Sequence, residues 1–357
     1  MMKRKRMRWL IELFQDLTEM VRSIRDLTTH VAMHSESPLV SIIIPVFNAE
    51  AYLAATLQSC LEQRYPNIEI IVINDGSTDG SSAILRDYDD ARIRVIETRN
   101  LGGCAARNTG IAQARGDLFQ FLDHDDVLAP DKLERQVRQV QIHGSDWIYS
   151  GDMGSVSGDQ REIDEGYELY QRDFSPAEYF QTVLSQYGKF LTTGVWLVPR
   201  ERVQATHGWD ARAGLNDDGE YFMRVLLNSR GIRYCKDAVF YFRRDVPASL
   251  SKRRDSDEVF EKWLFSYRSY VKEFHAHLEP DLARELSWKA LSVFYCNAFP
   301  HARELRKQCL SEIRALGYRR AYAHGGETLV KVARWAGIDA ALWLWQAKQC
   351  LRSIIIR

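Results

Sequence analysis

The sequence has little cysteine, no excess of either charge and no long apolar run. Its six cysteines among 357 residues form no C-x-x-C pair, so neither a zinc site nor a disulfide framework is expected, and a cytoplasmic location is favoured. Lysine plus arginine equals aspartate plus glutamate at 48 each, which gives no reason to expect a nucleic-acid partner. No stretch reaches the roughly 18 uncharged apolar residues that indicate a membrane-spanning helix. The remaining composition, 45% apolar and 27% charged, is typical of a folded protein.

The first 36 residues are expected to form an amphipathic helix. Basic residues open the chain, but Glu12, Asp16 and Glu19 interrupt the apolar run that a signal peptide would need, so none is expected. Apolar side chains recur every three or four positions from Leu10 to Val31, as in the seam of a coiled coil. We favour packing of this seam on the rest of the chain, and pairing of two chains as a homodimer is the alternative.

From residue 37 the pattern changes to alternating strands and helices. Val40 to Pro45 and Ile68 to Ile73 are β-branched runs typical of strands buried on both faces of a parallel sheet, and a helical stripe from Ala51 to Arg64 separates them. Further strands are expected at "RIRVIE", "DLFQFL", "GVWLVP" and "AVFYFR". This order predicts an α/β fold with a doubly wound sheet, in which ligands bind beyond the carboxyl ends of the strands. From about Asp255 onward the pattern predicts helices only.

Three carboxylates follow directly on one of the predicted strands. "DLFQFL" runs into Asp123, His124, Asp125 and Asp126, and the mutual repulsion of the carboxylates costs stability unless a cation lies among them. At the binding edge of a nucleotide-type sheet, such a cluster is suited to hold Mg²⁺ or Mn²⁺ that bridges a diphosphate. A D-x-D tripeptide alone is frequent in acidic surface turns, and the strand before it strengthens the prediction.

A second acidic turn, "INDGSTDG", also follows a predicted strand. Asp75 could accept hydrogen bonds from a nucleobase or a ribose, while Ser77 and Asp79 offer capping oxygens to the next helix. Taken alone, the pattern favours Asp75 as an ordinary turn residue.

Three stretches together resemble the family 2 glycosyltransferases of GT-A fold: "VSIIIPVFNAEAYLAATLQSCLEQRYPNIEIIVINDGSTDGS", "NLGGCAARNTGIAQARGDLFQFLDHDDVLAPDKLE" and "NDDGEYFMRVLLNSRG". The resemblance covers about residues 39 to 245. It implies a GT-A type mixed sheet with a Rossmann-like nucleotide-binding core. It also implies transfer of a sugar from a nucleoside diphosphate sugar, expected to be a UDP-sugar, to a hydroxyl of a saccharide or lipid-linked acceptor, with inversion and with Mn²⁺ or Mg²⁺ as cofactor. On this basis the domains are 1–36 (N-terminal helix), 37–250 (GT-A catalytic domain) and 251–357 (C-terminal helical region).

The resemblance also implies roles for individual residues. The base and ribose are expected beside the first two strands, and Arg107 in "AARNTGI" is expected to face the diphosphate. The D-x-D region is expected to supply both metal and ribose contacts, with no fixed division between them. The expected donor contacts are Pro45, Phe47, Asn48, Asp75, Arg107, Asp123 and Asp125, and the expected metal ligands are Asp123, Asp125 and Asp126.

The general base implied by the resemblance is Asp218, in "NDDGEYF". Inverting transfer is a single displacement in which the acceptor hydroxyl must lose its proton as it attacks. Asp217 and Glu220 have the spacing of a capping box for the following helix, which would leave Asp218 free to point into a cleft. The N-terminus of a helix tends to lower the pKa of a carboxylate, which would weaken Asp218 as a base.

Two departures from the family pattern concern the acceptor. Asp217 stands where the family often has glutamate, and Trp209, in "HGWD", stands where many members have phenylalanine. Trp209 could stack on an acceptor sugar, with Asp217 nearby, although a large tryptophan is more often part of a core.

The end of the chain interleaves tryptophans with basic residues, in "LVKVARWAGIDAALWLWQAKQCLRSIIIR". Such a pattern suits a helix on an anionic membrane surface, although it more often packs on its own protein. By family analogy the setting is the synthesis of a bacterial surface polysaccharide or glycoconjugate, in the cytoplasm or at the cytoplasmic face of the inner membrane.

Two other functions fit parts of the pattern. A nucleotidyltransferase would be expected to carry a Gly-rich loop with Lys or Arg after the first strand, and "PVFNAEAY" has neither Gly nor Lys. A non-catalytic nucleotide-sugar binding protein would have no need of Asp218.

Overall fold

The computed structural model describes residues 37–158, 160–185, 190–244, 246, 256–323 and 327–345. The predicted N-terminal helix, and with it the seam considered for a homodimer, lies outside these residues. None of the described helices is long and apolar enough to cross a membrane.

The α/β region contains a five-stranded sheet with the strand order β3-β2-β1-β4-β9. Neighbouring strands among the first four are parallel, and β9 pairs antiparallel with β4, so the predicted mixed sheet is confirmed. Every residue of β1, β2 and β4 is buried, as their β-branched and aromatic runs predict. The strands are β1 (Val40–Val46), β2 (Ile68–Asn74), β3 (Ile93–Glu97), β4 (Leu118–Phe121) and β9 (Val198–Pro199).

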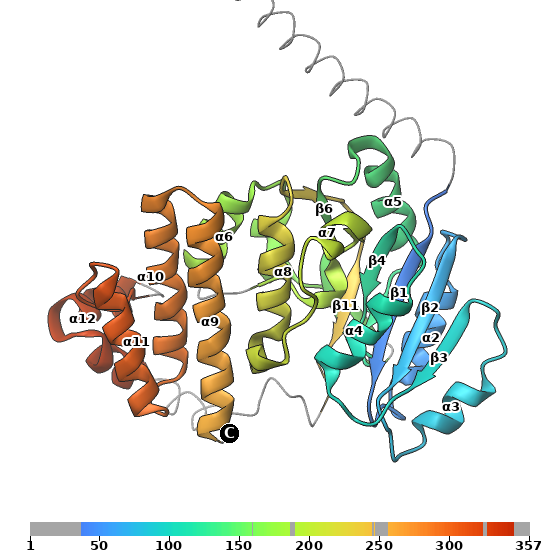
Figure 1. Cartoon of the computed structure of the whole chain (residues 1–357), viewed down its shortest axis with the longest axis horizontal. Coiled ribbons are helices and arrows are strands. Elements are labelled where there is room, and N and C mark those ends of the chain that lie inside the picture. The colour runs from blue at the N-terminus through green and yellow to red at the C-terminus, as the bar shows by residue number, and fades with distance from the viewer. Residues whose placement is uncertain are drawn as a thin grey trace, which may run out of the picture.

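Helices cover both faces of this sheet, with α4 in front of it and α2 behind it in Figure 1. The face under α4 is tightly packed, because a Cβ on Gly110 of α4 would collide with Ile43 of β1. The helices are α2 (Leu53–Leu61), α3 (Ser81–Asp87), α4 (Gly103–Gln113) and α5 (Lys132–His143).

A second sheet, in the order β5-β11-β7-β8, continues from the loop that follows β4. In this sheet β11 pairs with both β5 and β7, which brings the last strand of the α/β region beside the D-x-D loop. Two further strands, β6 and β10, pair in parallel. The bounds are β5 (Val127–Leu128), β6 (Ile148–Ser150), β7 (Met153–Ser157), β8 (Gln160–Ile163), β10 (Ile232–Tyr234) and β11 (Phe240–Arg243).

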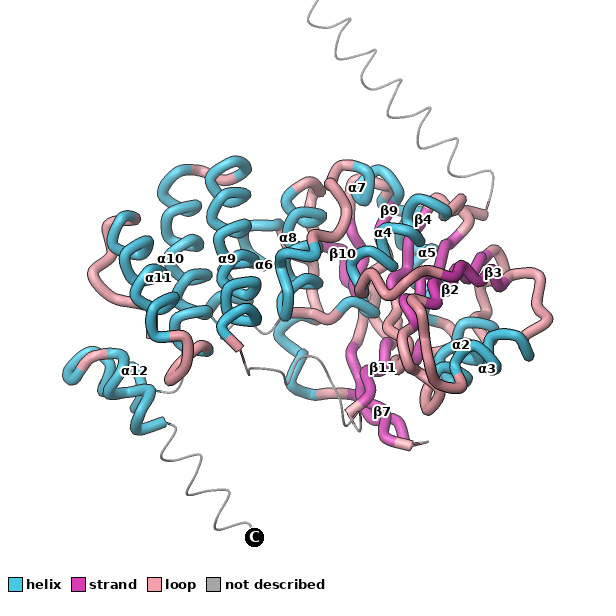
Figure 2. The backbone as a smooth tube through the Cα atoms, turned by 60° about the horizontal axis from the view of Figure 1, so that its bottom comes forward, coloured by secondary structure: helices cyan, strands magenta, loops and turns pink. Residues whose placement is uncertain are grey.

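Of the remaining elements, which are helical, α6 and α8 to α12 gather at the end of the molecule away from the five-stranded sheet, as Figure 2 shows, whereas α7 lies beside β9. Helix α9 packs against both α8 and α10, and the ring of Phe274 on α9 meets that of Phe180 on α6 at 5.0 Å. The helical C-terminal region is therefore confirmed, whereas the domain boundaries stay a prediction. The bounds are η1 (Glu165–Tyr170), α6 (Pro176–Ser185), η2 (Thr193–Val195), α7 (Arg200–Gln204), η3 (Ala211–Asn216), α8 (Asp217–Leu227), α9 (Asp257–His277), α10 (Pro280–Asn297), α11 (Arg303–Ala315) and α12 (Glu327–Ala336).

The tryptophan-rich end of the chain is described as far as residue 345. Trp343, Leu344 and Trp345 are largely exposed, and the ring of Trp343 also contacts that of Phe299 edge-on at 5.1 Å. Contact with a membrane stays a prediction.

Lys132 is a fully buried lysine at the start of α5. Its Nζ donates hydrogen bonds to Oε1 of Gln120 (2.6 Å) and Oε1 of Gln136 (2.7 Å). Burial lowers the pKa of Lys132 to about 7, because leaving water disfavours the charged form.

This buried lysine predicts a pH-dependent stability. Between pH 7 and about 10.4 the unfolded chain carries a proton on Lys132 that the folded chain lacks, so folding stability rises with pH, by at most about 1.4 kcal/mol per pH unit. Denaturant unfolding at pH 7.5 and 9.5 should show this rise in the wild type and lose it in Lys132→Met, whereas Lys272→Met at an exposed site should keep it. Parallel pH curves for wild type and Lys132→Met would contradict a neutral buried lysine.

Candidate active site

The first turns of α4 bring together the three acidic turns that the sequence singled out. Asp75, at the end of β2, accepts a hydrogen bond from the N–H of Gly102, just before α4. Arg107, one helical turn into α4, pairs with Asp123 after β4 and with Asp217 at the start of α8. Segments more than 100 residues apart therefore meet at one edge of the sheet, the edge at which parallel α/β sheets bind ligands.

Arg107 is the cation at the centre of this edge. Its Nη2 donates to Oδ1 of Asp123 at 2.6 Å, and its Nη1 lies 3.4 Å from Oδ2 of Asp217. The guanidinium carbon lies 4.4 Å from the centre of the Trp209 ring, and only 10% of the side chain is exposed. Arg107 thus joins the D-x-D loop to the acidic helix start. Its predicted contact with a diphosphate stays a prediction.

The D-x-D loop is also held from the second sheet. The N–H of Arg243, on β11, donates to Oδ1 of the buried Asp126 at 2.9 Å, and Nε of Arg243 donates to the carbonyl oxygen of Asp125 at 2.8 Å. The guanidinium of Arg243 lies over the ring of Tyr52. Sequence reasoning missed Arg243, and the signal that could have found it is the basic pair in "FRRD" at the end of the last predicted strand.

The carboxylates of the loop are held differently from one another. Asp123 is paired with Arg107, and Asp126 faces the backbone of Arg243. Burial raises the pKa of Asp126 well above its ordinary value, and the neighbouring Asp125 and Asp123 add to the effect. Burial likewise raises the pKa of Asp125, against the opposing charge of His124. Burial thus disfavours the ionised form of both carboxylates, and a cation bound beside them would favour it.

A divalent cation can bind at this loop with few protein ligands. Within the described ranges, no three His, Cys, Asp or Glu side chains are placed as ligands of one metal ion, and the assignment of Asp123, Asp125 and Asp126 to a metal stays a prediction. Mg²⁺ and Mn²⁺ at phosphate sites commonly take only one or two carboxylates together with phosphate oxygens. Asp125 is half-buried and lacks the pairing with Arg107 that holds Asp123, so it is the carboxylate that fits this role.

The residues predicted to border the nucleotide are largely engaged within the protein. The buried carboxylate of Asp75 accepts hydrogen bonds from the Thr98 hydroxyl (2.6 Å) and from the N–H groups of Leu101 (2.8 Å) and Gly102 (2.7 Å). These contacts give Asp75 a clear structural role in holding the loop before α4. Its contact with a base or ribose stays a prediction.

The loop after β1 is fixed against the loop after β2. Oδ1 of Asn48, a residue with positive φ, accepts from the N–H of Thr78 at 2.8 Å, and the carbonyl oxygen of Pro45 lies 3.3 Å from Nδ1 of His124. Phe47 between them is 41% exposed, although it is a large apolar side chain. An exposed aromatic ring at the binding edge is compatible with the predicted position of Phe47 beside the base and ribose.

Asp218 lies in the first turn of α8, half-buried. Its Oδ1 accepts from the N–H of Gly219 at 2.7 Å. Burial, followed by the charge of Asp217, raises the pKa of Asp218 to about 7, and Arg107 opposes the rise. The expectation that the helix N-terminus lowers this pKa was therefore wrong, because desolvation and a neighbouring carboxylate outweigh the helix dipole.

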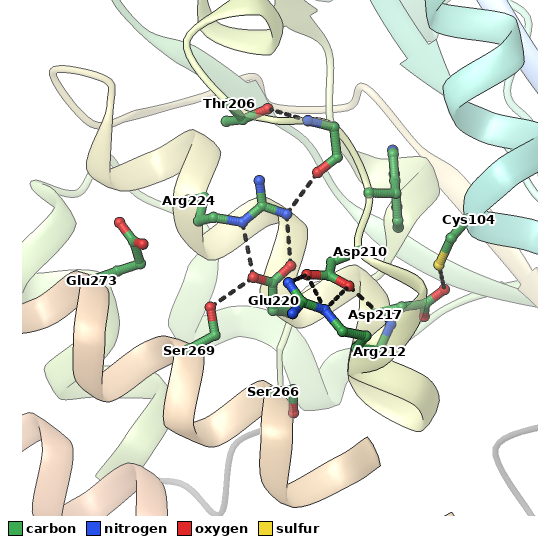
Figure 3. A network of polar contacts seen from close by, with 12 residues as sticks. Cys104, Thr206, Asp210, Arg212, Asp217, Glu220, Arg224, Ser266, Ser269 and Glu273 are labelled. Carbon is green, nitrogen blue, oxygen red and sulfur yellow. Dashed lines mark hydrogen bonds and ion pairs between the residues drawn. The ribbon is translucent and has the colours of Figure 1, made fainter.

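The predicted capping box is not formed. Asn216, not Asp217, is the N-cap residue of α8, and Asp217 lies in the first helical turn. Oδ2 of Asp217 accepts from the Cys104 thiol at 3.2 Å, whereas Glu220 is buried and paired with Arg224 (Figure 3). Oδ2 of Asp217 thus contacts α4, and Glu220 pairs with a residue one turn further along its own helix. The predicted acceptor contact of Asp217 stays a prediction.

The predicted stacking of Trp209 on an acceptor sugar was wrong. Trp209 is only 4% exposed, and its ring stacks on that of Tyr221 with centroids 4.2 Å apart. Arg107 lies over the Trp209 ring, and Phe121 meets it edge-on. With no accessible ring face, Trp209 packs against the guanidinium of Arg107 and is part of the core.

Comparisons with known proteins agree with this arrangement. A family model described as glycosyl transferase family 2 matches residues 41–191. A Bacillus subtilis protein named as glycosyltransferase EpsH is 30% identical over 241 residues, which cover 66% of this chain and 68% of that protein. A Haemophilus influenzae glycosyltransferase is 52% identical over 110 residues, which cover 30% of this chain and 44% of that protein, so this chain matches less than half of that relative's length.

Two solved structures show the same fold. Staphylococcus aureus TarS in complex with UDP-GlcNAc superposes with a TM-score of 0.66 at 18% identity, covering 87% of this chain and 91% of that one. The mannosyltransferase PcManGT of Pyrobaculum calidifontis, in complex with GDP-Man and Mn²⁺, gives a TM-score of 0.51 at 16% identity, with coverages of 88% and 87%. At this level of identity the likeness is evidence for the fold alone.

Proposed function

Because the chain belongs to the family 2 glycosyltransferases, we propose that it transfers a sugar from a nucleoside diphosphate donor to an acceptor hydroxyl with inversion, using Asp218 as general base. The observation that carries the proposal is the position of Asp218, a half-buried carboxylate with a pKa of about 7, on the segment that Arg107 ties to the D-x-D loop. A general base works best when its pKa lies near the working pH.

The proposed step is one displacement. The acceptor oxygen forms a bond to the anomeric carbon, the bond from that carbon to the diphosphate oxygen breaks, and the proton of the acceptor hydroxyl passes to a carboxylate oxygen of Asp218. Asp123 is held by Arg107, and Asp126 by the backbone of Arg243, which leaves Asp125 to hold a divalent cation together with the donor phosphates. When bound, that cation would neutralise charge on the leaving diphosphate.

The donor and the setting are proposals at a finer level. We propose a UDP-sugar donor, supported by the UDP-GlcNAc in the TarS structure, and Mn²⁺ or Mg²⁺, supported by the Mn²⁺ in the PcManGT structure. As the acceptor we propose a saccharide or a lipid-linked saccharide, in the synthesis of a bacterial surface polysaccharide or glycoconjugate.

A donor panel tests this function. The purified chain is incubated with UDP, GDP and dTDP sugars and saccharide acceptors, and release of nucleoside diphosphate is followed with Mn²⁺, with Mg²⁺ and with EDTA. We expect release with one nucleotide class, its loss in EDTA and its recovery when metal is restored. Full activity in EDTA would contradict the metal proposal, and donor binding without release under any condition would favour a binding protein.

The same assay locates the metal. Asp125→Asn should lose metal-dependent donor binding in calorimetry, because the substitution replaces an anionic ligand by a neutral one. Asp89→Asn, at an exposed position after α3, is the matched control and should bind like the wild type. Metal-dependent binding that survives in Asp125→Asn would remove Asp125 from the ligand set.

A further inference from the structure

We propose that helix α9, in the C-terminal helical region, is a positioning element of the active site that fixes the start of α8 through Ser266, Ser269 and Tyr270. The inference rests on the proposed function, because the residue being positioned is Asp218. It assigns a catalytic role to a segment outside the region that the family model matches.

Contacts from α9 lie on both sides of Asp218 along the chain. Before it, Nδ2 of Asn216 donates to the Ser266 hydroxyl at 3.1 Å and to the Tyr270 hydroxyl at 3.2 Å. After it, the Ser269 hydroxyl donates to Oε1 of Glu220 at 2.7 Å. Positions 266, 269 and 270 follow the three-four spacing of one helix face, so α9 turns a polar stripe toward the helix start that carries the base.

The contacts of Asn216 are buried, that of Ser269 is partly buried, and further hydrogen bonds extend from Glu220. Glu220, which accepts from Ser269, also forms a two-point ion pair with Arg224 at 2.8 and 2.7 Å, and Nη2 of Arg224 donates to the carbonyl oxygen of Gly208 at 2.7 Å (Figure 3). A buried charge pair whose remaining hydrogen-bonding sites are satisfied has one well-defined geometry. The network therefore fixes α8 relative to both α9 and the loop that contains Trp209.

Gly219 shows how closely α9 approaches the base. A Cβ at this position, next to Asp218, would lie 2.7 Å from the Tyr270 hydroxyl and would overlap Oδ1 of Asn216. Any side chain here would push the first turn of α8 away from α9. Because a shift of about 1 Å in a reacting group can cost about 100-fold in rate, the close approach has a kinetic consequence.

Ordinary core packing is the competing explanation for the same contacts. If α9 only stabilises the fold, its polar stripe contributes to the unfolding free energy and not to the transfer step. If α9 positions Asp218, loss of one hydroxyl should lower kcat while the donor KM and the melting temperature change little, because the donor contacts lie on other elements.

The experiment compares single hydroxyl deletions in the full chain, with the donor and acceptor that the panel identifies. We expect Ser269→Ala and Tyr270→Phe to lower kcat by about 10- to 100-fold with donor KM within about twofold of the wild type, and Ser269→Thr, which keeps the hydroxyl, to restore kcat. Ser287→Ala is the control, because this buried serine of α10 has a hydroxyl with no hydrogen-bond partner within the described part of the chain. Wild-type kcat in both deletion variants, or kcat losses that merely follow the melting temperature, would overturn the proposal.

A double-mutant cycle tests the geometry independently. Gly219→Ala should lower kcat, and the Gly219→Ala/Tyr270→Phe pair should lose less than the product of the two single effects, because phenylalanine removes one of the two oxygens that the new methyl group would meet. Multiplicative effects would contradict a shared contact.

Asp218→Asn distinguishes failure of the proposed base from failure of the proposed role of α9. If it keeps full kcat, the assigned base is wrong; if it loses transfer while the α9 variants do not, only the inference about α9 fails.

Discussion

Asp218→Asn is expected to lower kcat for sugar transfer by about 10²- to 10⁴-fold, the usual contribution of a general base. Asparagine keeps the size of the side chain and can still accept the hydrogen bond that Gly219 donates to Oδ1, but it cannot take up a proton at neutral pH. Donor binding should persist, because the predicted donor contacts lie in β1, in the loops after β1, β2 and β4, and on α4, and not on α8. Calorimetry with the donor and steady-state transfer kinetics measure the two effects separately.

The pH dependence identifies the group. Because the pKa of Asp218 is about 7, kcat/KM of the wild type should fall about tenfold per pH unit below pH 7 as the base becomes protonated. This fall is the acid limb of the pH profile, and Asp218→Asn should lack it. Asp217→Asn should keep the limb and move it to lower pH, because the charge of Asp217 raises the pKa of Asp218. An unchanged limb in the Asp218→Asn protein would assign it to another group.

Stability provides the control against misfolding. The folded-state pKa of Asp218 is raised, so the folded chain binds more protons than the unfolded chain between about pH 4 and 7, and stability falls as pH rises through that window. Above pH 7 the wild type carries the full cost of a buried carboxylate. The melting temperature of Asp218→Asn at pH 8 should therefore equal or exceed that of the wild type, and a lower value would indicate damage to the fold.

The strands and the acidic turns were predictable because their signals are local. β1 and β2 are buried on both faces, and most of their positions are apolar, so the β-branched runs in the sequence carry the information. The buried Ser41 and Glu69 are hydrogen-bonded to each other. The D-x-D loop could be placed at the binding edge for the same reason, since it directly follows β4.

The partners of each side chain were not predictable, because they depend on contacts between distant segments. Trp209 is enclosed by Tyr221 and by Arg107, which is 102 positions earlier. The local sequence around a tryptophan in a turn does not indicate which distant residues will pack on its ring. The helix start was misassigned by one residue because η3 runs directly into α8, with Gly214 in a non-helical conformation. The pKa of Asp218 was misjudged because burial is a property of the assembled fold.

Arg107→Met is expected to impair both stability and catalysis. The substitution leaves Asp123 and Asp217 without their shared cation, and their side chains are only 35% and 27% exposed. Removing one partner of a fully buried ion pair costs about 3–5 kcal/mol; with partly exposed carboxylates we expect about 1–3 kcal/mol in denaturant unfolding. Arg92→Met, which breaks a similar pair with Asp90 away from the binding edge, should cost less than about 1 kcal/mol and leave transfer unchanged.

Arg107→Met should also shift the pH profile of kcat/KM, which a loss of stability alone would not do. Arg107 holds down the pKa of Asp218, while Asp217 and Asp123 raise it, so without the guanidinium the acid limb of kcat/KM should move to higher pH and transfer at pH 7 should fall. Arg107→Lys should restore the limb only in part, because a single ammonium cannot span two carboxylates and lie flat on Trp209. Adding Asp217→Asn to Arg107→Met removes one unpaired charge and should move the limb back toward lower pH. If the limb stays at the wild-type pH in Arg107→Met, the guanidinium does not influence the base, and the link that it forms between the D-x-D loop and α8 is structural only.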